Sequence, residues 1–474
     1  MESLSDSSTV CTYHAEQPLH DLFGKEWKPD YKAFPFLEAY EKYKDNHNCD
    51  DWFKNIKVTK FIERSSELGP IYNFVFFGKL ENKYDVVFKV NIGEPYPTSA
   101  SAKFEYEQKI YQMIMNVLLV NKITPNIIGY IGSITCNKNI LAKYGNNSKI
   151  IEKFNNIVEI SRVDKINKSC MTILAMQGLK SPVLFIKYGL DKNLTKLNVK
   201  SVIFQILHTI LVFNEIKFMH MDFHIGNILI EKDTSNTNFD GYIKYVFKNG
   251  KHVNVHTKNN LVKVYDFDQS MTELLNKSKF VKDNINNYDV PKVCTNDYDK
   301  SKYGYVSNCK SYKKEKDLTT FMTNINYLIY YLERNQDPMD RDYNFDHRDM
   351  NPIFIETIGE FYSIYRDYSI NLEEILGNKF FDGLNMDFEL KTTNKIMDTY
   401  GLSSIKHVPV TPKTIPIDKP KTDEPSQPDK PKEGNIREAR KHLDKLEEVS
   451  VQSGGYYYYK YLKYKNKYEN LKIY

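Results

Sequence analysis

A short loop and a later strand end carry the residues whose types and spacing best suit chemistry. The loop runs from His220 to Asn227 and places Asp222 five residues before Asn227, and Asp266 follows a strand-like run further along. A carboxylate can orient an attacking hydroxyl and accept its proton, while an amide oxygen and a second carboxylate can hold Mg²⁺ on phosphates. This set of residues therefore points to phosphoryl transfer from ATP.

Two charged residues upstream stand where the same chemistry needs them. Lys89 ends a strand-like run, and its ammonium could bind the α- and β-phosphates if a carboxylate held it in place. Glu107 is the candidate carboxylate, because it lies on the next expected helix and shares a helical face with Tyr111 and Ile114. Glu105 is the competing residue on that helix. Each charge alone could be a solvated surface group, so the interpretation depends on their joint order.

The order of these motifs (strand lysine, helix glutamate, His-x-Asp-x-x-x-x-Asn, then Asp-Phe) resembles that of the protein-kinase-like superfamily. The resemblance covers about residues 58–384 and is most specific over 218–229. It implies an α+β, two-lobed fold with a small β-rich N-lobe and a larger helical C-lobe. The sequence over residues 204–207 and 220–229 is similar to that of serine/threonine kinase-like proteins of giant DNA viruses (mimivirus-like). That similarity implies a host cytoplasm or viral factory, with virion packaging left open and secretion not expected.

The resemblance assigns roles around the His220 loop and makes ATP and Mg²⁺ the expected cofactors. Asp222 would be the catalytic base, and Asn227 and Asp266 would be the metal ligands. His220 would brace the catalytic loop, and Asp317 would anchor that loop from the following helix.

The ATP-binding residues that the resemblance implies are Lys89, its ion-pair partner Glu107, and Gly69. Gly69 is the only glycine in the segment that would cover the phosphates, and Pro70 removes a backbone N–H donor there. His224 stands where many of these kinases carry lysine, so it joins the catalytic candidates. Its imidazole can donate to the γ-phosphate but is fully charged only when protonated.

The phosphate acceptor is the open part of this interpretation. Asp268 replaces the glycine that usually follows Asp-Phe, and no Ala-Pro-Glu-like segment lies between Asp268 and Asp317. A serine/threonine protein kinase acting on a protein substrate is the main prediction. A small-molecule phosphotransferase of the aminoglycoside- and choline-kinase-like type is the first alternative, because enzymes of that type share the His-x-Asp-x-His motif. A catalytically silent kinase-like scaffold is the second.

Four segments are predicted along the chain. They are an N-terminal extension (1–56), a kinase-like domain (57–385), a disordered linker rich in proline and lysine (386–434) and a helical tail rich in tyrosine and lysine (435–474). The tail has five lysines against one glutamate over 456–474, so it is a candidate for docking a partner, although such runs are more often plain solvated surface.

Periodicity predicts the elements that must position the chemistry. Aromatic and β-branched runs at 72–77 and 84–90 predict two strands joined by a turn at residues 81–82. Residues 99–120 predict a helix with an apolar stripe, and a second apolar helix over 200–219 leads into the His220 loop. Further on, Asn249-Gly250 predicts a hairpin turn, and Asp317 opens another helix.

Composition bounds the class of the protein. The 474 residues are 41% hydrophobic and 27% charged, which is typical of a soluble globular chain. No apolar run approaches the roughly 20 residues that a membrane span needs, so none is predicted. The net charge of +5 gives no specific signal for nucleic acid. The six scattered cysteines form no Cys-x-x-Cys pair and predict reduced thiols.

Overall fold

The computed structural model describes the parts of the chain that would hold the candidate site. The described residues are 36–62, 73–92, 99–120, 122–137, 139–144, 148–152, 155, 170–232, 242–257, 260–267, 270–272, 316–334, 349–365, 372–384 and 398–401. The chain divides into one unit of Met1–Arg334 with Arg348–Ile405 and a second unit of Asn335–His347 with Lys406–Tyr474. All described residues belong to the first unit. The predicted tail, most of the predicted linker, Gly69 and Asp268 lie outside them.

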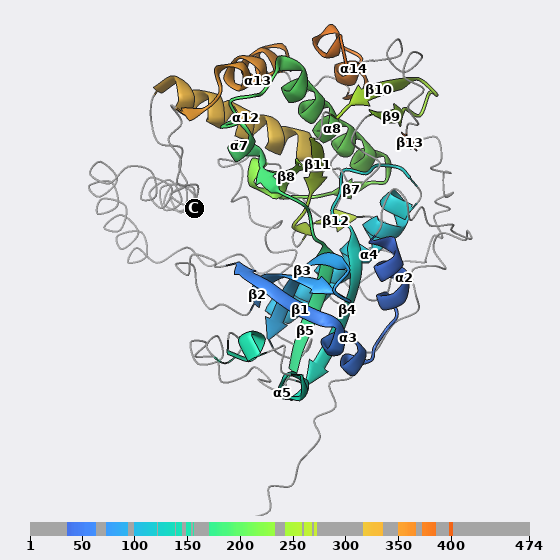
Figure 1. The fold of residues 1–474 in the computed structure, drawn as a ribbon. Coiled ribbons are helices and arrows are strands. Elements are labelled where there is room, and N and C mark those ends of the chain that lie inside the picture. The colour runs from blue at the N-terminus through green and yellow to red at the C-terminus, as the bar shows by residue number, and fades with distance from the viewer. Residues whose placement is uncertain are drawn as a thin grey trace, which may run out of the picture. The chain divides into compact units, whose positions relative to one another are not determined.

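A five-stranded antiparallel sheet forms the N-terminal region (Figure 1). Its strands, in the order β1-β2-β3-β5-β4, are β1 (Ile56–Ile62), β2 (Asn73–Leu80), β3 (Tyr84–Ile92), β5 (Cys170–Gln177) and β4 (Tyr130–Asn137). The two strands predicted at 72–77 and 84–90 are confirmed as β2 and β3. Glu81 and Asn82 both have φ of 56°, as expected for a tight hairpin turn. Lys89 therefore lies on the central strand of the sheet, between Val75 on one side and Leu174 on the other.

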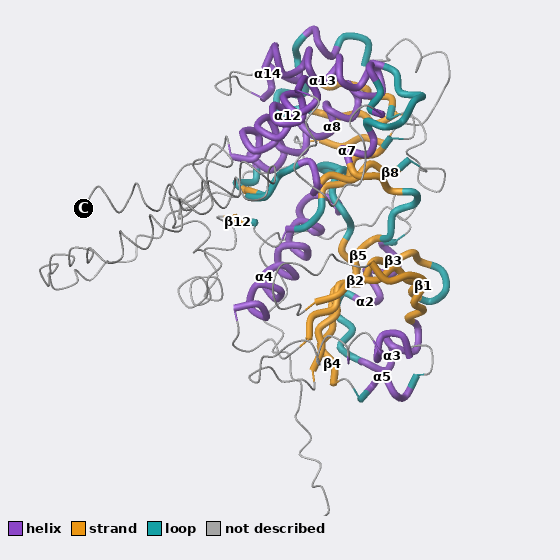
Figure 2. The backbone as a smooth tube through the Cα atoms, turned by 90° about the vertical axis from the view of Figure 1, so that its left-hand side faces the viewer, coloured by secondary structure: helices purple, strands orange, loops and turns teal. Residues whose placement is uncertain are grey.

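The helix predicted over 99–120 is confirmed, with a change of geometry near its end. It begins as α4 (Ser99–Ile114) and continues as a π-helical segment, η1 (Met115–Val120). The residues of its apolar stripe whose side chains the structure describes, Ile110, Met113, Ile114 and Leu118, are buried. In Figure 2, α4 is the helix drawn beside the strands of the N-terminal sheet, and it contacts β4. The carboxylate of Glu107 is thereby brought to the sheet that carries Lys89.

Two helices from the predicted N-terminal extension pack on the same sheet. They are α2 (Leu37–Tyr43) and α3 (Cys49–Asn55), and both contact β4. Trp52 and Tyr43 are fully buried and meet ring edge to face, with centroids 4.8 Å apart. A Cβ at Gly132 of β4 would lie 2.7 Å from the Tyr43 carbonyl oxygen, so only glycine allows this close approach. At least residues 36–55 are thus part of the folded body.

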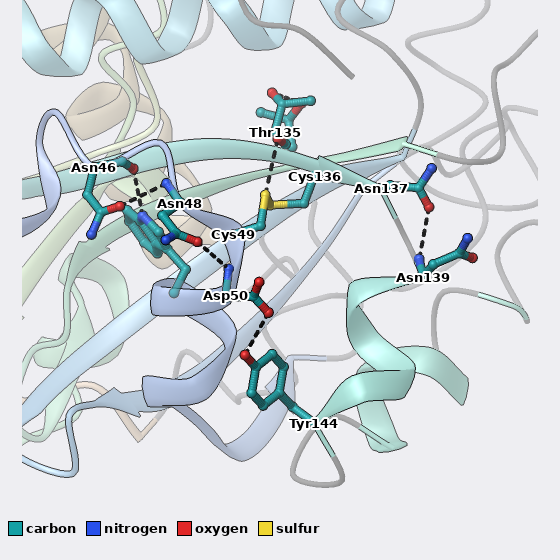
Figure 3. The surroundings of a disulfide bond; sticks show 11 residues. Asn46, Asn48, Cys49, Asp50, Thr135, Cys136, Asn137, Asn139 and Tyr144 are labelled. Carbon is teal, nitrogen blue, oxygen red and sulfur yellow. Dashed lines mark hydrogen bonds between the residues drawn. A yellow bond between two sulfur atoms is a disulfide. The ribbon is translucent and has the colours of Figure 1, made fainter. Parts of the chain in front are cut away.

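The prediction of reduced thiols is wrong for the three cysteines that the structure describes. Cys49 at the start of α3 and Cys136 on β4 form a disulfide, with their Cα atoms 6.0 Å apart and a sequence separation of 87 (Figure 3). Cys170 on β5 is also disulfide-bonded. Sequence spacing could not reveal the Cys49–Cys136 pair, because it exists only once α3 packs on β4.

The short helix α5 (Ile140–Lys143) follows β4 and contacts α3. The remaining α-helices of the described chain come after β5. They are α7 (Phe185–Tyr188), α8 (Lys196–Glu215), α12 (Lys316–Arg334), α13 (Pro352–Tyr365) and α14 (Leu372–Leu376), and the 3₁₀ turn η8 (Lys379–Phe381) follows them. The predicted helices that lead into the His220 loop and begin near Asp317 are confirmed as α8 and α12. By length and composition α8 could cross a membrane, but 89% of its most apolar window is buried in the fold. It is therefore a core helix.

Three small sheets accompany these helices. One contains β11 (Leu261–Val264), β8 (Ile228–Glu231) and β6 (Pro182–Leu184); another pairs β7 (Phe218–Met219) with β12 (Met271–Thr272); the third contains β10 (His252–His256), β9 (Tyr242–Val246) and β13 (Asp398–Gly401). The Asn-Gly turn between β9 and β10 is confirmed, with Gly250 at φ 80°. β13 runs parallel to β9 and lies within the predicted linker, so the linker prediction is wrong for these four residues.

The described architecture is a mixed α+β fold with a sheet-rich N-terminal region followed by helices, which confirms the predicted class at that level.

Candidate active site

A buried ion pair joins the N-terminal sheet to α4. Lys89 Nζ lies 2.6 Å and 2.8 Å from the two carboxylate oxygens of Glu107, and the two side chains are only 8% and 2% exposed. Lys89 Nζ is also 3.6 Å from Asp266 Oδ1, and the Asp266 side chain is 32% exposed. The choice of Glu107 over Glu105 as the lysine's partner is thereby confirmed. The cation stands between a buried carboxylate and one that reaches solvent.

Asp266 follows β11 and is held in an uncommon backbone conformation. Its φ is 62°, in the left-handed region that residues with a Cβ seldom adopt. Its backbone N–H donates to the Tyr111 hydroxyl at 3.1 Å. The next residue, Phe267, is fully buried, with its ring centroid 5.0 Å from that of Tyr111 and 4.9 Å from that of His220. Packing of Phe267 thus fixes the segment that presents the Asp266 carboxylate.

Asp222 and Asn227 are brought together by the 3₁₀ turn η3 (Ile225–Asn227). The Asn227 amide nitrogen donates to the backbone oxygen of Asp222 at 2.9 Å and lies 3.4 Å from its Oδ2. Because the amide nitrogen is engaged in this way, the Asn227 side-chain oxygen is the atom available to a ligand. The Asp222 side chain is 36% exposed, so its carboxylate can reach an acceptor from outside the fold.

His224 lies beside Asp222 with a defined ring orientation. Its Nδ1 accepts the backbone N–H of Gly226 at 3.0 Å, so a neutral imidazole carries its proton on Nε2. Nε2 lies 3.5 Å from Asp222 Oδ2. The ring therefore presents an N–H donor on the same side as the carboxylate of Asp222.

The loop is anchored from behind by Asp317. Its two carboxylate oxygens accept the backbone N–H groups of His220 at 2.8 Å and of Met221 at 3.0 Å, which are the anchoring contacts that the resemblance implied. Burial raises the pKa of Asp317, against the lowering effect of His220 and these two hydrogen bonds. His220 Nε2 lies 2.9 Å from the Tyr265 carbonyl oxygen, to which it can only donate. His220 thus connects the loop to the residue before Asp266.

A buried polar network lies behind the site and was missed from the sequence. Asn126 is fully buried, and its amide nitrogen donates to Gln205 on α8 at 2.9 Å and to the Val262 carbonyl oxygen at 3.1 Å. The same network includes Tyr245, whose hydroxyl donates to Asn126 Oδ1 at 2.9 Å. The segment after α4 is thereby tied to β11, the strand that leads to Asp266.

Lys263 on β11 is part of the same connection. Its ammonium is fully buried and donates to the carbonyl oxygens of Pro125 at 2.8 Å and Ile127 at 3.3 Å. Burial lowers the pKa of Lys263 to about 8, while the nearby Glu231 charge acts in the opposite direction. A lysine within the apolar run 261–264 was the sequence signal that could have revealed it.

The donor set fits a magnesium ion shared with phosphates. No group of three His, Cys, Asp or Glu side chains suited to a metal occurs among the described residues. The Asn227 side-chain oxygen and the Asp266 carboxylate are nevertheless the hard oxygen donors that Mg²⁺ prefers, and Mg²⁺ is commonly held by one or two protein groups together with phosphates and water. A backbone hydrogen bond joins the two segments that carry these donors, because the N–H of Tyr265, the residue before Asp266, donates to the Asn227 carbonyl oxygen at 3.2 Å.

No protein-family model matches this chain, and the search of curated proteins finds no match either.

Proposed function

We propose that the protein is an ATP-dependent phosphotransferase with a two-lobed, protein-kinase-like fold, most specifically a serine/threonine protein kinase. One observation carries this proposal: the buried Lys89 ammonium stands between Glu107 and Asp266. A structural ion pair needs only one carboxylate. A second, solvent-accessible carboxylate next to the cation suits a site where phosphates and a metal ion meet.

Lys89 and Glu107 form the phosphate-binding side of the proposed site. Glu107 contacts the ammonium with both oxygens and so fixes its direction, because the two side chains are buried and cannot reorient freely. The ammonium would bind the α- and β-phosphates of ATP. Asn227 and Asp266 would hold Mg²⁺, which when bound would neutralise charge on the phosphates.

Asp222 and His224 form the acceptor side. The carboxylate of Asp222 would orient the attacking hydroxyl and take its proton, and the hydrogen bond from Asn227 to the Asp222 backbone keeps the loop in shape. The Nε2 atom of His224 lies 3.5 Å from the Asp222 carboxylate. Its N–H could therefore donate to an anionic phosphate oxygen bound next to Asp222. Asp317 and His220 would position the loop without touching the reacting atoms.

Incubation of the purified chain with γ-labelled ATP and Mg²⁺ tests the proposal. The acceptor panel should contain a serine/threonine peptide library, small alcohols and small amines, and Asp222→Asn serves as the matched inactive control. Label on peptides with the natural chain alone is the expected result. Label on small molecules alone would replace the protein-kinase assignment with a small-molecule phosphotransferase. No label, together with no thermal shift at millimolar ATP and Mg²⁺, would favour a silent scaffold.

A further inference from the structure

The conformation of Asp266 needs a specific support. A non-glycine residue with a φ of 62° is disfavoured, because its Cβ approaches the following carbonyl group. Such conformations persist only where the surroundings hold them in place. In the proposed site this conformation determines where the Asp266 carboxylate lies, 3.6 Å from Lys89 Nζ.

Tyr111 supplies the support from α4. Its hydroxyl accepts the Asp266 N–H at 3.1 Å, and its ring meets Phe267 edge to face, with an interplanar angle of 88°. Tyr111 is 1% exposed, so this hydrogen bond is shielded from competing water. Hydroxyl and ring thus act on two consecutive residues of the segment that carries the carboxylate.

Tyr111 also lies one helical turn after Glu107 on α4. We propose that Tyr111 is a positioning residue, which uses its hydroxyl to set the Asp266 carboxylate in register with the Lys89–Glu107 pair. One helix then orients both the cation and the metal-binding carboxylate. This inference rests on the proposed function and adds to it a residue that does not itself touch ATP or metal.

The rest of the fold leaves little freedom to replace this contact. The chain that follows α4 is hydrogen-bonded to Val264, the last residue of β11. The Val264 N–H donates to the Asn126 carbonyl oxygen at 2.9 Å, and the Val264 carbonyl oxygen accepts the Ile128 N–H at 3.0 Å. Backbone hydrogen bonds therefore hold the chain that follows α4 against the strand that leads to Asp266. Without the Tyr111 hydroxyl, the fold cannot easily shift to offer the Asp266 N–H another acceptor.

Tyr111→Phe tests the proposal, because it removes the hydroxyl and keeps the ring against Phe267. Amide hydrogen exchange at Asp266 should become about tenfold faster, which corresponds to the loss of one hydrogen bond. In the active enzyme, kcat should fall and the Mg²⁺ concentration for half-maximal rate should rise, each about fivefold to tenfold, with KM for ATP nearly unchanged. Tyr188→Phe is the matched control, because Tyr188 is fully buried and its hydroxyl has no hydrogen-bond partner among the described residues.

The two readouts separate the inference from the proposed function. If the natural chain transfers no phosphate, the proposed function fails, while exchange at Asp266 still reports whether the hydroxyl holds the backbone. Unchanged exchange at Asp266 in Tyr111→Phe would overturn the positioning role. Faster exchange with unchanged kcat and unchanged Mg²⁺ dependence in an active enzyme would overturn it as well, since the hydroxyl would then be merely structural.

Discussion

Glu107 places both of its carboxylate oxygens within 2.8 Å of the Lys89 ammonium, and neither side chain is more than 8% exposed. Burying both charges costs solvation free energy, which a buried ion pair recovers only when its geometry is good. Such a pair is weak evidence for stability. It gains meaning here because the same ammonium lies 3.6 Å from the carboxylate of Asp266.

Substitutions at this pair should separate stability from turnover. Lys89→Met leaves the Glu107 carboxylate buried without its cation and should lower the free energy of unfolding by about 3–5 kcal/mol. The double variant Lys89→Met with Glu107→Leu should recover most of that loss, because no unpaired charge remains. Both variants should lack phosphoryl transfer. Urea unfolding and labelled-ATP turnover measure the two effects, and a double variant with normal turnover would exclude Lys89 from the chemistry.

His208 on α8 should make the protein sensitive to acid. It is fully buried beside Tyr245, with ring centroids 4.5 Å apart, and neither ring nitrogen has a hydrogen-bond partner among the described residues. Burial lowers the pKa of His208 to about 3, from an ordinary value of 6.5. Below pH 6.5 His208 binds a proton in the unfolded chain but not in the folded protein. The free energy of unfolding therefore falls by up to about 1.4 kcal/mol per pH unit until the pH reaches the pKa of His208 in the folded protein.

Unfolding free energies at pH 7 and pH 5 test this dependence. Between pH 7 and pH 5, His208→Phe should lose roughly 2 kcal/mol less unfolding free energy than the natural chain. The reason is that 1.5 pH units of this range lie below the ordinary histidine pKa of 6.5. His252→Asn, at an exposed position of β10, is the control and should keep the natural slope. An unchanged slope in His208→Phe would mean that another group causes the acid sensitivity.

The disulfide between Cys49 and Cys136 should contribute measurably to stability. It links residues with a sequence separation of 87, so replacing both cysteines by serine should lower the free energy of unfolding by about 2–4 kcal/mol, mainly by freeing the unfolded chain. Peptide mapping under non-reducing conditions should recover the two cysteines as one linked species. Finding both as free thiols in purified protein that was never reduced would contradict the pairing.

Two truncations should differ because of β13. A chain that ends after Leu402 keeps β13 against β9 and should retain both its thermal midpoint and its phosphate transfer to a small test substrate. A chain that ends after Met397 loses four cross-strand pairs and should be destabilised by about 1–2 kcal/mol. Equal thermal midpoints for the two truncated chains would show that β13 does not contribute to stability. Loss of turnover in the chain that ends after Leu402 would show that residues beyond 402 are needed for activity.

Local signals in the sequence were enough to predict much of the scaffold. The strands that became β2 and β3, and the turns at Glu81-Asn82 and Asn249-Gly250, depend on neighbouring residues and on left-handed backbone positions. The helix phase that favoured Glu107 over Glu105 is local as well, and Glu107 is the residue bonded to Lys89. Roles in phosphate transfer remain predictions, because contacts alone do not measure chemistry.

Non-local contacts were out of reach for the same reasoning. The pairing of β13 with β9 and the Cys49–Cys136 disulfide join segments far apart in the chain, and no local pattern encodes either. The network of Asn126, Gln205 and Lys263 consists of polar residues that sequence reasoning assigns to the surface, although all three are fully buried. Their hydrogen bonds to one another and to backbone groups offset the loss of hydration.

Phosphate transfer by Asp222→Asn tests the central claim most directly. The substitution is nearly isosteric, and the Asn227 amide can still donate to the Asp222 backbone oxygen, so the loop should keep its shape. Turnover should fall by about a thousandfold or more, while the dissociation constant for ATP with Mg²⁺ changes little, because the carboxylate acts on the acceptor in the transition state. Full turnover in Asp222→Asn would contradict the assignment of this loop as the catalytic centre.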